Sequence, residues 1–173
     1  MRIVAGRWRG RKIEAPTDKQ VRPTLDSVRE AWMNILQLSI PGAKVLDLYA
    51  GSGALGLEAL SRGAVHADFV EKDGRVVRAL RKNVEMLDAG AATTVHQMDA
   101  LRYVSALASS SYDIAFADPP YLSESATALA SKWQLIPFAA LLSIEHAAIQ
   151  TMPGSPEIRR YGSTAISIYR SED

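Results

Sequence analysis

The sequence Val-Leu-Asp-Leu-Tyr-Ala-Gly-Ser-Gly-Ala-Leu-Gly at residues 45–56 decides the fold. Its start is apolar and predicts a buried strand, and its glycines at 51, 53 and 56 fit the spacing G-x-G-x-x-G. A strand that runs through such a turn into a helix presents unpaired helix N–H groups at the turn. Glu71, twenty residues after Gly51, is placed to accept hydrogen bonds from ribose hydroxyls. The stretch therefore predicts a binding site for a nucleoside cofactor.

Two related loops are excluded by neighbouring residues. A phosphate-binding loop of NTPases continues with Lys and Ser or Thr, but Leu57 and Glu58 stand there. A nucleophile elbow needs glycine two residues to each side of its serine, whereas Ala50 and Ala54 flank Ser52 at that spacing. Dinucleotide oxidoreductases and methyltransferases that use S-adenosylmethionine share the remaining pattern, so the glycine loop alone leaves both classes open.

Strands and helices alternate after this loop. Strands are expected at 44–48, 65–71, 93–97, 112–117 and 141–149, and helices at 54–62, 76–87, 101–108 and 125–133. Strands separated by helices of this length build a parallel sheet covered on both faces. Gly162 and Ser163 separate two further short strands, at 157–161 and 165–169, which predict an antiparallel hairpin. The expected fold class is α/β, with a mostly parallel seven-stranded sheet, helices on both faces and a C-terminal antiparallel hairpin.

Carboxylates follow or close four of the expected strands. They are Asp47, Glu71, Asp99 and Asp118. Because the carboxyl ends of parallel strands meet at one edge of the sheet, where ligands bind, these four side chains are expected to share a site. Asp99, like Asp73, also suits the N-cap of the following helix.

The stretch Asp118-Pro119-Pro120-Tyr121 predicts an acceptor site for an amino group. Consecutive prolines hold φ near −65° and have no backbone N–H, so the loop is rigid and offers carbonyl groups. The carboxylate of Asp118 and the carbonyl of Pro119 can both accept N–H groups from an amine on a base, and Tyr121 can stack on that base. The alternative is a strand-end turn with a core tyrosine.

Composition excludes several classes of protein. The chain has 173 residues, 47% apolar residues and no cysteine, which fits one compact domain without thiol chemistry or thiolate metal sites. His66, His96 and His146 lie 30 and 50 residues apart, so no metal site is expected. No apolar run is long enough to cross a bilayer. We expect a cytoplasmic protein that does not enter a membrane.

Positive charge is concentrated at the N-terminus. Residues 1–29 carry eight Lys or Arg against three Asp or Glu, although the net charge of the chain is only +1. Such segregation suits a polyanion, and Trp8, among these charges, is able to stack on a base. A short hairpin within residues 1–13 and a helix from Thr24 are expected here. We therefore expect residues 1–40 to be a basic extension that faces nucleic acid, attached to a cofactor-binding domain at 41–173. A monomer is expected, because no helix shows a second apolar stripe.

Further motifs make the chain resemble the bacterial RsmD family. Asp-Pro-Pro-Tyr together with the glycine loop resembles amino-group methyltransferases that use S-adenosylmethionine. The motifs that narrow the resemblance are Gly6-Arg7-Trp8-Arg9-Gly10-Arg11-Lys12, Val21-Arg22-Pro23-Thr24, Val28-Arg29-Glu30, Asn34 and Tyr161-Gly162-Ser163-Thr164 with Ile166 and Tyr169. The resemblance implies a Rossmann-like class I methyltransferase that modifies the N2 amine of a guanine in 16S rRNA, guanine 966 in the family.

The resemblance also implies roles for particular residues, without any metal. The cofactor S-adenosylmethionine, with S-adenosylhomocysteine as its product, would contact Asp47, Tyr49, Ala50, Gly51, Ser52, Gly53, Glu71, Lys72, Asp99 and Ala100. The catalytic residues would be Asp118, Pro119, Pro120 and Tyr121. The RNA, free or in the small-subunit particle, would contact Arg7, Arg9, Arg11, Arg22, Thr24 and Arg29.

Three other functions are compatible with part of the sequence. A methyltransferase for a base amine of DNA or of another RNA fits, because the Asp-Pro-Pro-Tyr loop recognises an amine rather than one base. A noncatalytic RNA-binding protein explains the basic N-terminus but not the cofactor loop. A Rossmann oxidoreductase explains the glycine loop but neither Asp118-Pro119-Pro120-Tyr121 nor the basic N-terminus.

Overall fold

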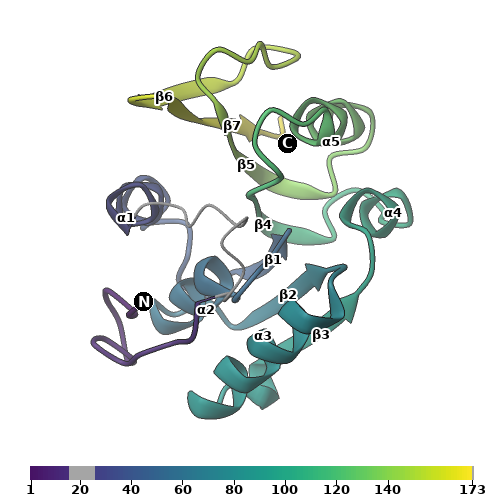
Figure 1. Ribbon diagram of the computed structural model, residues 1–173. Coiled ribbons are helices and arrows are strands. Elements are labelled where there is room, and N and C mark those ends of the chain that lie inside the picture. Colours follow the sequence, from purple (N-terminus) through teal and green to yellow (C-terminus); the bar gives the residue numbers. More distant parts are fainter. Residues whose placement is uncertain (16–25, 173) are drawn as a thin grey trace.

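A computed structural model describes residues 1–15 and 26–172 of the chain (Figure 1). The expected RNA contacts of Arg22 and Thr24, and the start of the first helix at Thr24, lie outside the described residues. Within the described part, no helix is both long and apolar enough to span a membrane.

The described elements form one mixed sheet with helices on both faces, which confirms the expected fold class. The helices are α1 (Asp26–Ile35), α2 (Ala54–Ser61), α3 (Gly74–Met86), α4 (Ala100–Ser105) and α5 (Ser125–Leu135), with a 3₁₀ turn η1 (Gly90–Ala92). The strands are β1 (Lys44–Leu48), β2 (His66–Glu71), β3 (Thr93–Gln97), β4 (Tyr112–Ala117), β5 (Ala139–Ala147), β6 (Glu157–Tyr161) and β7 (Thr164–Arg170). The sheet order is β3-β2-β1-β4-β5-β7-β6. Strands β1 to β5 pair in parallel, and β7 is antiparallel to both β5 and β6.

Each face of the sheet has its own apolar core. Helices α1, α2 and α3 pack on one face, where Trp32, Leu57 and Leu80 meet Phe69 and Phe116 of the strands (Figure 1). Helices α4 and α5 cover the other face. Because side chains alternate along each strand, both faces of the buried strands must be apolar, as the near-continuous apolar runs in β1 and β4 indicate.

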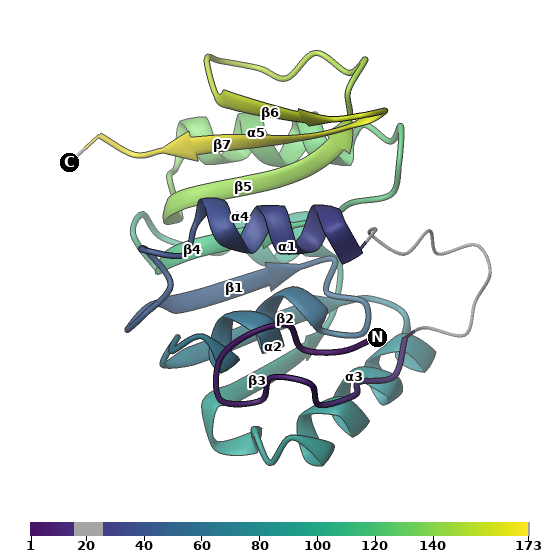
Figure 2. The same ribbon diagram turned by 90° about the vertical axis from the view of Figure 1, so that its left-hand side faces the viewer.

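Helix α1 lies across β4 and β5 on the first face (Figure 2). The indole Nε1 of Trp32 donates a 2.9 Å hydrogen bond to Oγ of Ser143 in β5, and its ring meets Phe116 of β4 edge-on at 5.9 Å. Trp32 is fully buried. This anchor fixes α1 against β4 and β5.

The fifth strand begins and ends two residues earlier than expected. Ala139 pairs with Tyr112, and the chain turns after Ala147, where the N–H of Gln150 donates to the Ala147 carbonyl. Ile149 lies in that turn and is 86% exposed. In a sequence pattern, the apolar Ile149 cannot be distinguished from a strand residue, which explains why the predicted strand ended two residues too late.

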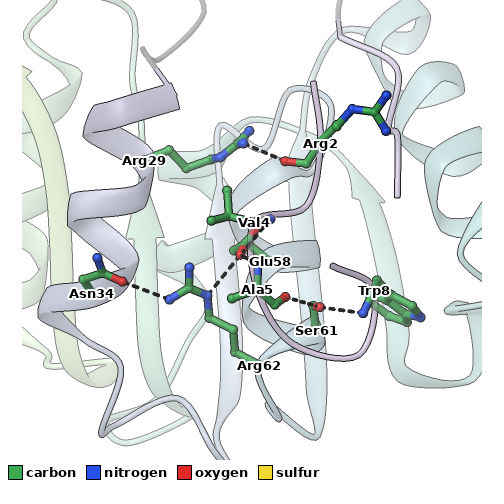
Figure 3. A network of polar contacts seen from close by, with 9 residues as sticks. All are labelled: Arg2, Val4, Ala5, Trp8, Arg29, Asn34, Glu58, Ser61 and Arg62. Carbon is green, nitrogen blue, oxygen red and sulfur yellow. Dashed lines mark hydrogen bonds and ion pairs between the residues drawn. The ribbon is translucent and has the colours of Figure 1, made fainter. Parts of the chain in front are cut away.

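The N-terminal segment, residues 1–15, is fixed to α2 and α3. A single bridge between Arg2 and Lys12 makes the expected hairpin. The carboxylate of Glu58 accepts hydrogen bonds from the N–H groups of Val4 and Ala5, each at 3.0 Å (Figure 3). At the other end, the buried Asn83 side chain bonds both the N–H and the carbonyl of Glu14. The segment is therefore part of the folded domain.

Trp8 does not serve as a stacking platform for RNA, contrary to the sequence prediction. Its side chain is only 9% exposed and belongs to the core under α2. Its backbone N–H donates to Oγ of Ser61 at 3.0 Å (Figure 3), and the guanidinium of Arg7 covers its ring at 4.2 Å. The tryptophan attaches the segment to the domain instead.

Candidate functional site

A cavity of about 850 Å³ opens at the carboxyl edge of the sheet. It is lined by the ends of β1, β2, β4 and β5, the loop after β3, the first turn of α1 and the β6–β7 turn. The predicted residues that line it are Asp47, Tyr49, Ala50, Gly51, Ser52, Glu71, Lys72, Asp99, Ala100, Asp118, Pro119, Pro120, Tyr121 and Arg29. The structure thus brings the expected cofactor loop and the Asp-Pro-Pro-Tyr loop to one cavity.

Glycine is required at two positions of the loop after β1 for different structural reasons. A Cβ at Gly51 would meet nothing within 4 Å, so this residue leaves room on the cavity side. Gly53 has φ +83° and would place a Cβ 2.3 Å from Leu80 Cδ1, so it serves the packing of α3 and does not line the cavity. Tyr49 adopts a left-handed conformation, φ 57°, which costs backbone energy and marks a constrained loop.

Glu71 joins the two loops that flank the cofactor position. Its Oε2 accepts from the N–H of Gly51 and its Oε1 from the N–H of Asp73, both at 3.0 Å. A carboxylate oxygen has two lone pairs, so both oxygens keep acceptor capacity for hydroxyl groups. The side chain is half-buried, which leaves it accessible from the cavity.

Asp47 is a buried carboxylate beside two others. It is 1% exposed, and its Oδ2 accepts from the N–H of Gly56 at 2.9 Å, within the first turn of α2. Burial raises the pKa of Asp47 well above its ordinary value, the Gly56 N–H opposes this, and the charges of Asp118 and Glu71 raise it further. The cavity therefore has a surplus of negative charge that suits a positively charged ligand.

Replacing Asp47 by Asn is expected to stabilise the ligand-free protein at neutral pH. A carboxyl group with a raised pKa in the folded chain binds its proton more tightly there, so ionisation lowers the free energy of unfolding as the pH rises above 3.8, the ordinary value. The gain should be absent below that pH. Urea unfolding of both proteins at acidic and neutral pH measures it, and an equal gain at both pH values would contradict the electrostatic cause.

The Asp-Pro-Pro-Tyr loop follows β4 directly. Asp118 donates its N–H to the carbonyl of Leu48 at 3.4 Å, which continues the β1–β4 pairing for one more residue. The carbonyl of Pro120 accepts from Ser123, and the hydroxyl of Tyr121 donates to the carbonyl of Ser163 in the β6–β7 turn at 3.1 Å. The loop is thus held at both ends, with Tyr121 45% exposed at the cavity.

The two capping aspartates behave as the sequence predicts. Asp73 caps α3 through the N–H of Arg75, and Asp99 caps α4 through the N–H of Arg102, each at 2.9 Å. Asp99 and the neighbouring Ala100, which follow β3 in the chain, also line the cavity on the side away from β4.

The predicted RNA-contacting arginines fall into two groups. Arg7, Arg9 and Arg11 are exposed on the N-terminal segment and do not line the cavity. Arg11 donates to the carbonyl of Met86 at 2.6 Å. Arg29 is instead 3% exposed and lies inside the cavity wall.

Glu145 and His146 line the cavity but were missed in the sequence. Ala117 pairs with Ile144, so the following residues, Asp118 and Glu145, lie side by side on neighbouring strands. The apolar pattern predicted the end of this strand at residue 149, away from both. His146 is buried, its Nε2 lies 2.7 Å from Oγ of Ser167, and burial lowers its pKa. If β5 had been predicted two residues earlier, Glu145 would have been recognised as a carboxylate near the end of a fifth strand.

The sheet order and the cavity define a Rossmann-like methyltransferase fold. A solved structure of an RNA methyltransferase from Salinibacter ruber, in complex with S-adenosyl-L-homocysteine, matches with a TM-score of 0.65 at 15% identity, over 86% of this chain and 93% of that one. At this identity the likeness shows the fold alone. A hypothetical protein of Thermus thermophilus matches with a TM-score of 0.84 at 29% identity, over 99% of both chains.

The family follows from the sequence comparisons. The family described as Conserved hypothetical protein 95 matches residues 1–170. Ribosomal RNA small subunit methyltransferase D of Escherichia coli K12 is 46% identical over 121 residues, which cover 70% of this chain and 60% of that protein. The chain belongs to this family, the RsmD family.

Proposed function

We propose that this protein transfers the methyl group of S-adenosylmethionine to the N2 amine of a guanine in 16S rRNA, the family site being guanine 966. One observation carries the proposal: the Asp118-to-Tyr121 loop and the glycine loop after β1 line the same cavity. The first offers acceptors for an amine, and the second offers a nucleoside position beside it. Family membership supports methyl transfer to ribosomal RNA, since the Escherichia coli relative is named as a ribosomal RNA small subunit methyltransferase.

The cavity residues fit the proposed cofactor in shape and charge. Glu71 offers acceptors for the ribose hydroxyls, and the open side of Gly51 leaves space for close approach. Asp47 and Glu71 are carboxylates at the proposed cofactor position, and the sulfonium and ammonium groups of the cofactor are positive. Asp99 and Ala100 are proposed to meet the adenine, and Lys72 follows Glu71 at the ribose. When bound, S-adenosylmethionine supplies an electrophilic methyl group.

The Asp-Pro-Pro-Tyr loop is proposed to hold the amine that accepts the methyl group. The lone pair of a guanine amine is delocalised into the ring, so the nitrogen must become pyramidal as it reacts. The Asp118 carboxylate and the Pro119 carbonyl favour that geometry by accepting both N–H groups, and their fixed positions orient the nitrogen. Asp118 need not be a strong base, since the proton can leave after transfer.

The target nucleotide is proposed to enter the cavity out of its stack. A base within a duplex cannot reach a cavity at the edge of a sheet, so it must be extruded or lie in an irregular RNA element. Tyr121, which is 45% exposed at the cavity, is proposed to stack on it. The exposed Arg7, Arg9 and Arg11 are proposed to contact the RNA backbone outside the cavity, together with Arg22 and Thr24.

Methyl transfer from labelled S-adenosylmethionine tests the proposal. The substrates are small-subunit particles and naked ribosomal RNA from cells without the enzyme, with DNA alongside, and the products are identified by nucleoside mass analysis. N2-methylguanosine in RNA is expected. Methylated adenine or cytosine in DNA would show that the loop acts on another base amine. Cofactor binding without any product would contradict the proposed substrate.

A further inference from the structure

The guanidinium of Arg29 is buried with only part of its hydrogen-bonding capacity used. Its Nη2 donates to the carbonyl of Arg2 at 2.9 Å and lies 3.4 Å from Oδ1 of Asp26 (Figure 3 shows the first contact). Its Nε and Nη1 atoms are buried and have no hydrogen-bond partner in the described part of the chain. Leaving N–H groups of a buried cation unpaired is costly, so a partner that the described residues do not supply is expected.

This guanidinium is held in place by rigid neighbours. Helix α1 is anchored to β5 through Trp32 and Ser143. The carbonyl of Arg2 belongs to the N-terminal segment, which Glu58 fixes two residues further on (Figure 3). Arg29 is therefore held in one orientation at the wall of the cavity that also holds Asp118.

The charges of the cavity residues indicate which chemical group of a ligand Arg29 binds. The described lining contains carboxylates at Asp47, Glu71, Asp73, Asp99, Asp118 and Glu145, but cationic side chains only at Arg29 and Lys72. S-adenosylmethionine has one anionic group, the α-carboxylate of its methionine moiety. Lys72 follows Glu71 at the end of β2, the proposed ribose position. Arg29 belongs to α1, which lies across β4 and β5 (Figure 2). These two strands and β2 lie on opposite sides of β1 in the sheet.

We propose that Arg29 binds the α-carboxylate of the cofactor. This inference rests on the proposed function, which supplies S-adenosylmethionine as the ligand. A planar guanidinium matches a carboxylate with paired, charge-assisted hydrogen bonds, which a lysine at the same position reproduces only as a point charge. The role differs from the RNA contact that the family resemblance implies for Arg29, and it explains why this arginine is buried while Arg7, Arg9 and Arg11 are exposed.

Calorimetric binding of two ligands by the full-length protein tests this inference. S-adenosylhomocysteine retains the amino-acid moiety, and 5′-methylthioadenosine lacks it. In Arg29→Met, the Kd of S-adenosylhomocysteine is expected to rise roughly 10- to 100-fold, the effect of losing hydrogen bonds to a charged group. The Kd of 5′-methylthioadenosine is expected to stay nearly unchanged. The Kd of S-adenosylhomocysteine for Arg29→Lys is expected to lie between the values for wild type and Arg29→Met. Arg29→Lys also provides the same comparison of the two ligands if Arg29→Met does not fold.

Lys72→Met is the matched control, because it removes the same charge from the same cavity at the ribose end. It is expected to change both Kd values by the same factor. An equal loss of affinity for both ligands in the Arg29 variants would indicate a structural role and overturn the inference. So would an unchanged Kd for S-adenosylhomocysteine with a raised KM for RNA, which would assign Arg29 to the nucleotide. A wild-type protein that binds neither ligand would instead refute the proposed function itself.

Discussion

Replacement of Asp118 by alanine is expected to lower kcat for methyl transfer roughly 100- to 1,000-fold, the usual effect of removing one preorganised group that stabilises a transition state. The affinity for S-adenosylmethionine should change little, because the proposed partner of Asp118 is the target amine. Steady-state transfer of labelled methyl measures the first quantity, and calorimetry with S-adenosylhomocysteine measures the second.

Two further variants make this prediction specific. Asp118→Asn keeps one acceptor oxygen but turns an N–H₂ group toward the amine, so it should recover little activity. Glu124→Ala is the control, because Glu124 is an exposed acid near the same loop that does not line the cavity and makes no side-chain capping bond. Parallel losses of turnover and cofactor affinity in Asp118→Ala would show structural damage instead of a role in the reaction.

Local sequence patterns predicted most of the sheet. The expected bounds of β1, β3, β4 and β6 match the structure, since each strand is a short run between turn residues or helix caps. The same patterns failed at β5, where Ile149 extended the apolar run into an exposed turn. That error also hid Glu145, because a strand end is found only when the strand itself is placed correctly.

The contacts that fix the N-terminal segment could not be predicted in this way. Trp8 bonds Ser61, 53 residues later, and Glu14 bonds Asn83, 69 residues later. Periodicity within a helix or strand carries no information about such partners. Composition indicated correctly that the segment is basic, but it did not indicate that Trp8 is buried or that Arg29 is buried at the cavity wall.

Asn83 shows how such long-range contacts reach the candidate site. Its fully buried Nδ2 donates to the carbonyls of Glu14 and Ser52, each at 2.9 Å. Ser52 belongs to the loop proposed to hold the cofactor. One side chain of α3 therefore joins the N-terminal segment to that loop, although a lone asparagine in a helix gives no sign of this in the sequence.

Replacement of Glu58 by alanine is expected to lower the free energy of unfolding by about 3–5 kcal/mol, the effect of removing one partner from a buried ion pair. Glu58 is 1% exposed, and its Oε1 accepts from Nε of Arg62 at 3.0 Å as well as from the N-terminal segment (Figure 3). Without it, the N–H groups of Val4 and Ala5 and the charge of Arg62 lose their partner.

Urea unfolding measures the change in free energy, and hydrogen exchange locates it. Exchange should increase most at residues 3–8, because their anchor is lost while the sheet remains paired. Glu58→Gln keeps an acceptor for one N–H and should lose less stability, and Glu85→Ala, at an exposed position on α3, should lose almost none. Since the segment carries the Arg2 carbonyl that orients Arg29, Glu58→Ala should also weaken binding of S-adenosylhomocysteine more than binding of 5′-methylthioadenosine. Uniform exchange across the whole sheet with equal weakening of both ligands would contradict this account, because it would mean that Glu58 stabilises the domain without positioning Arg29.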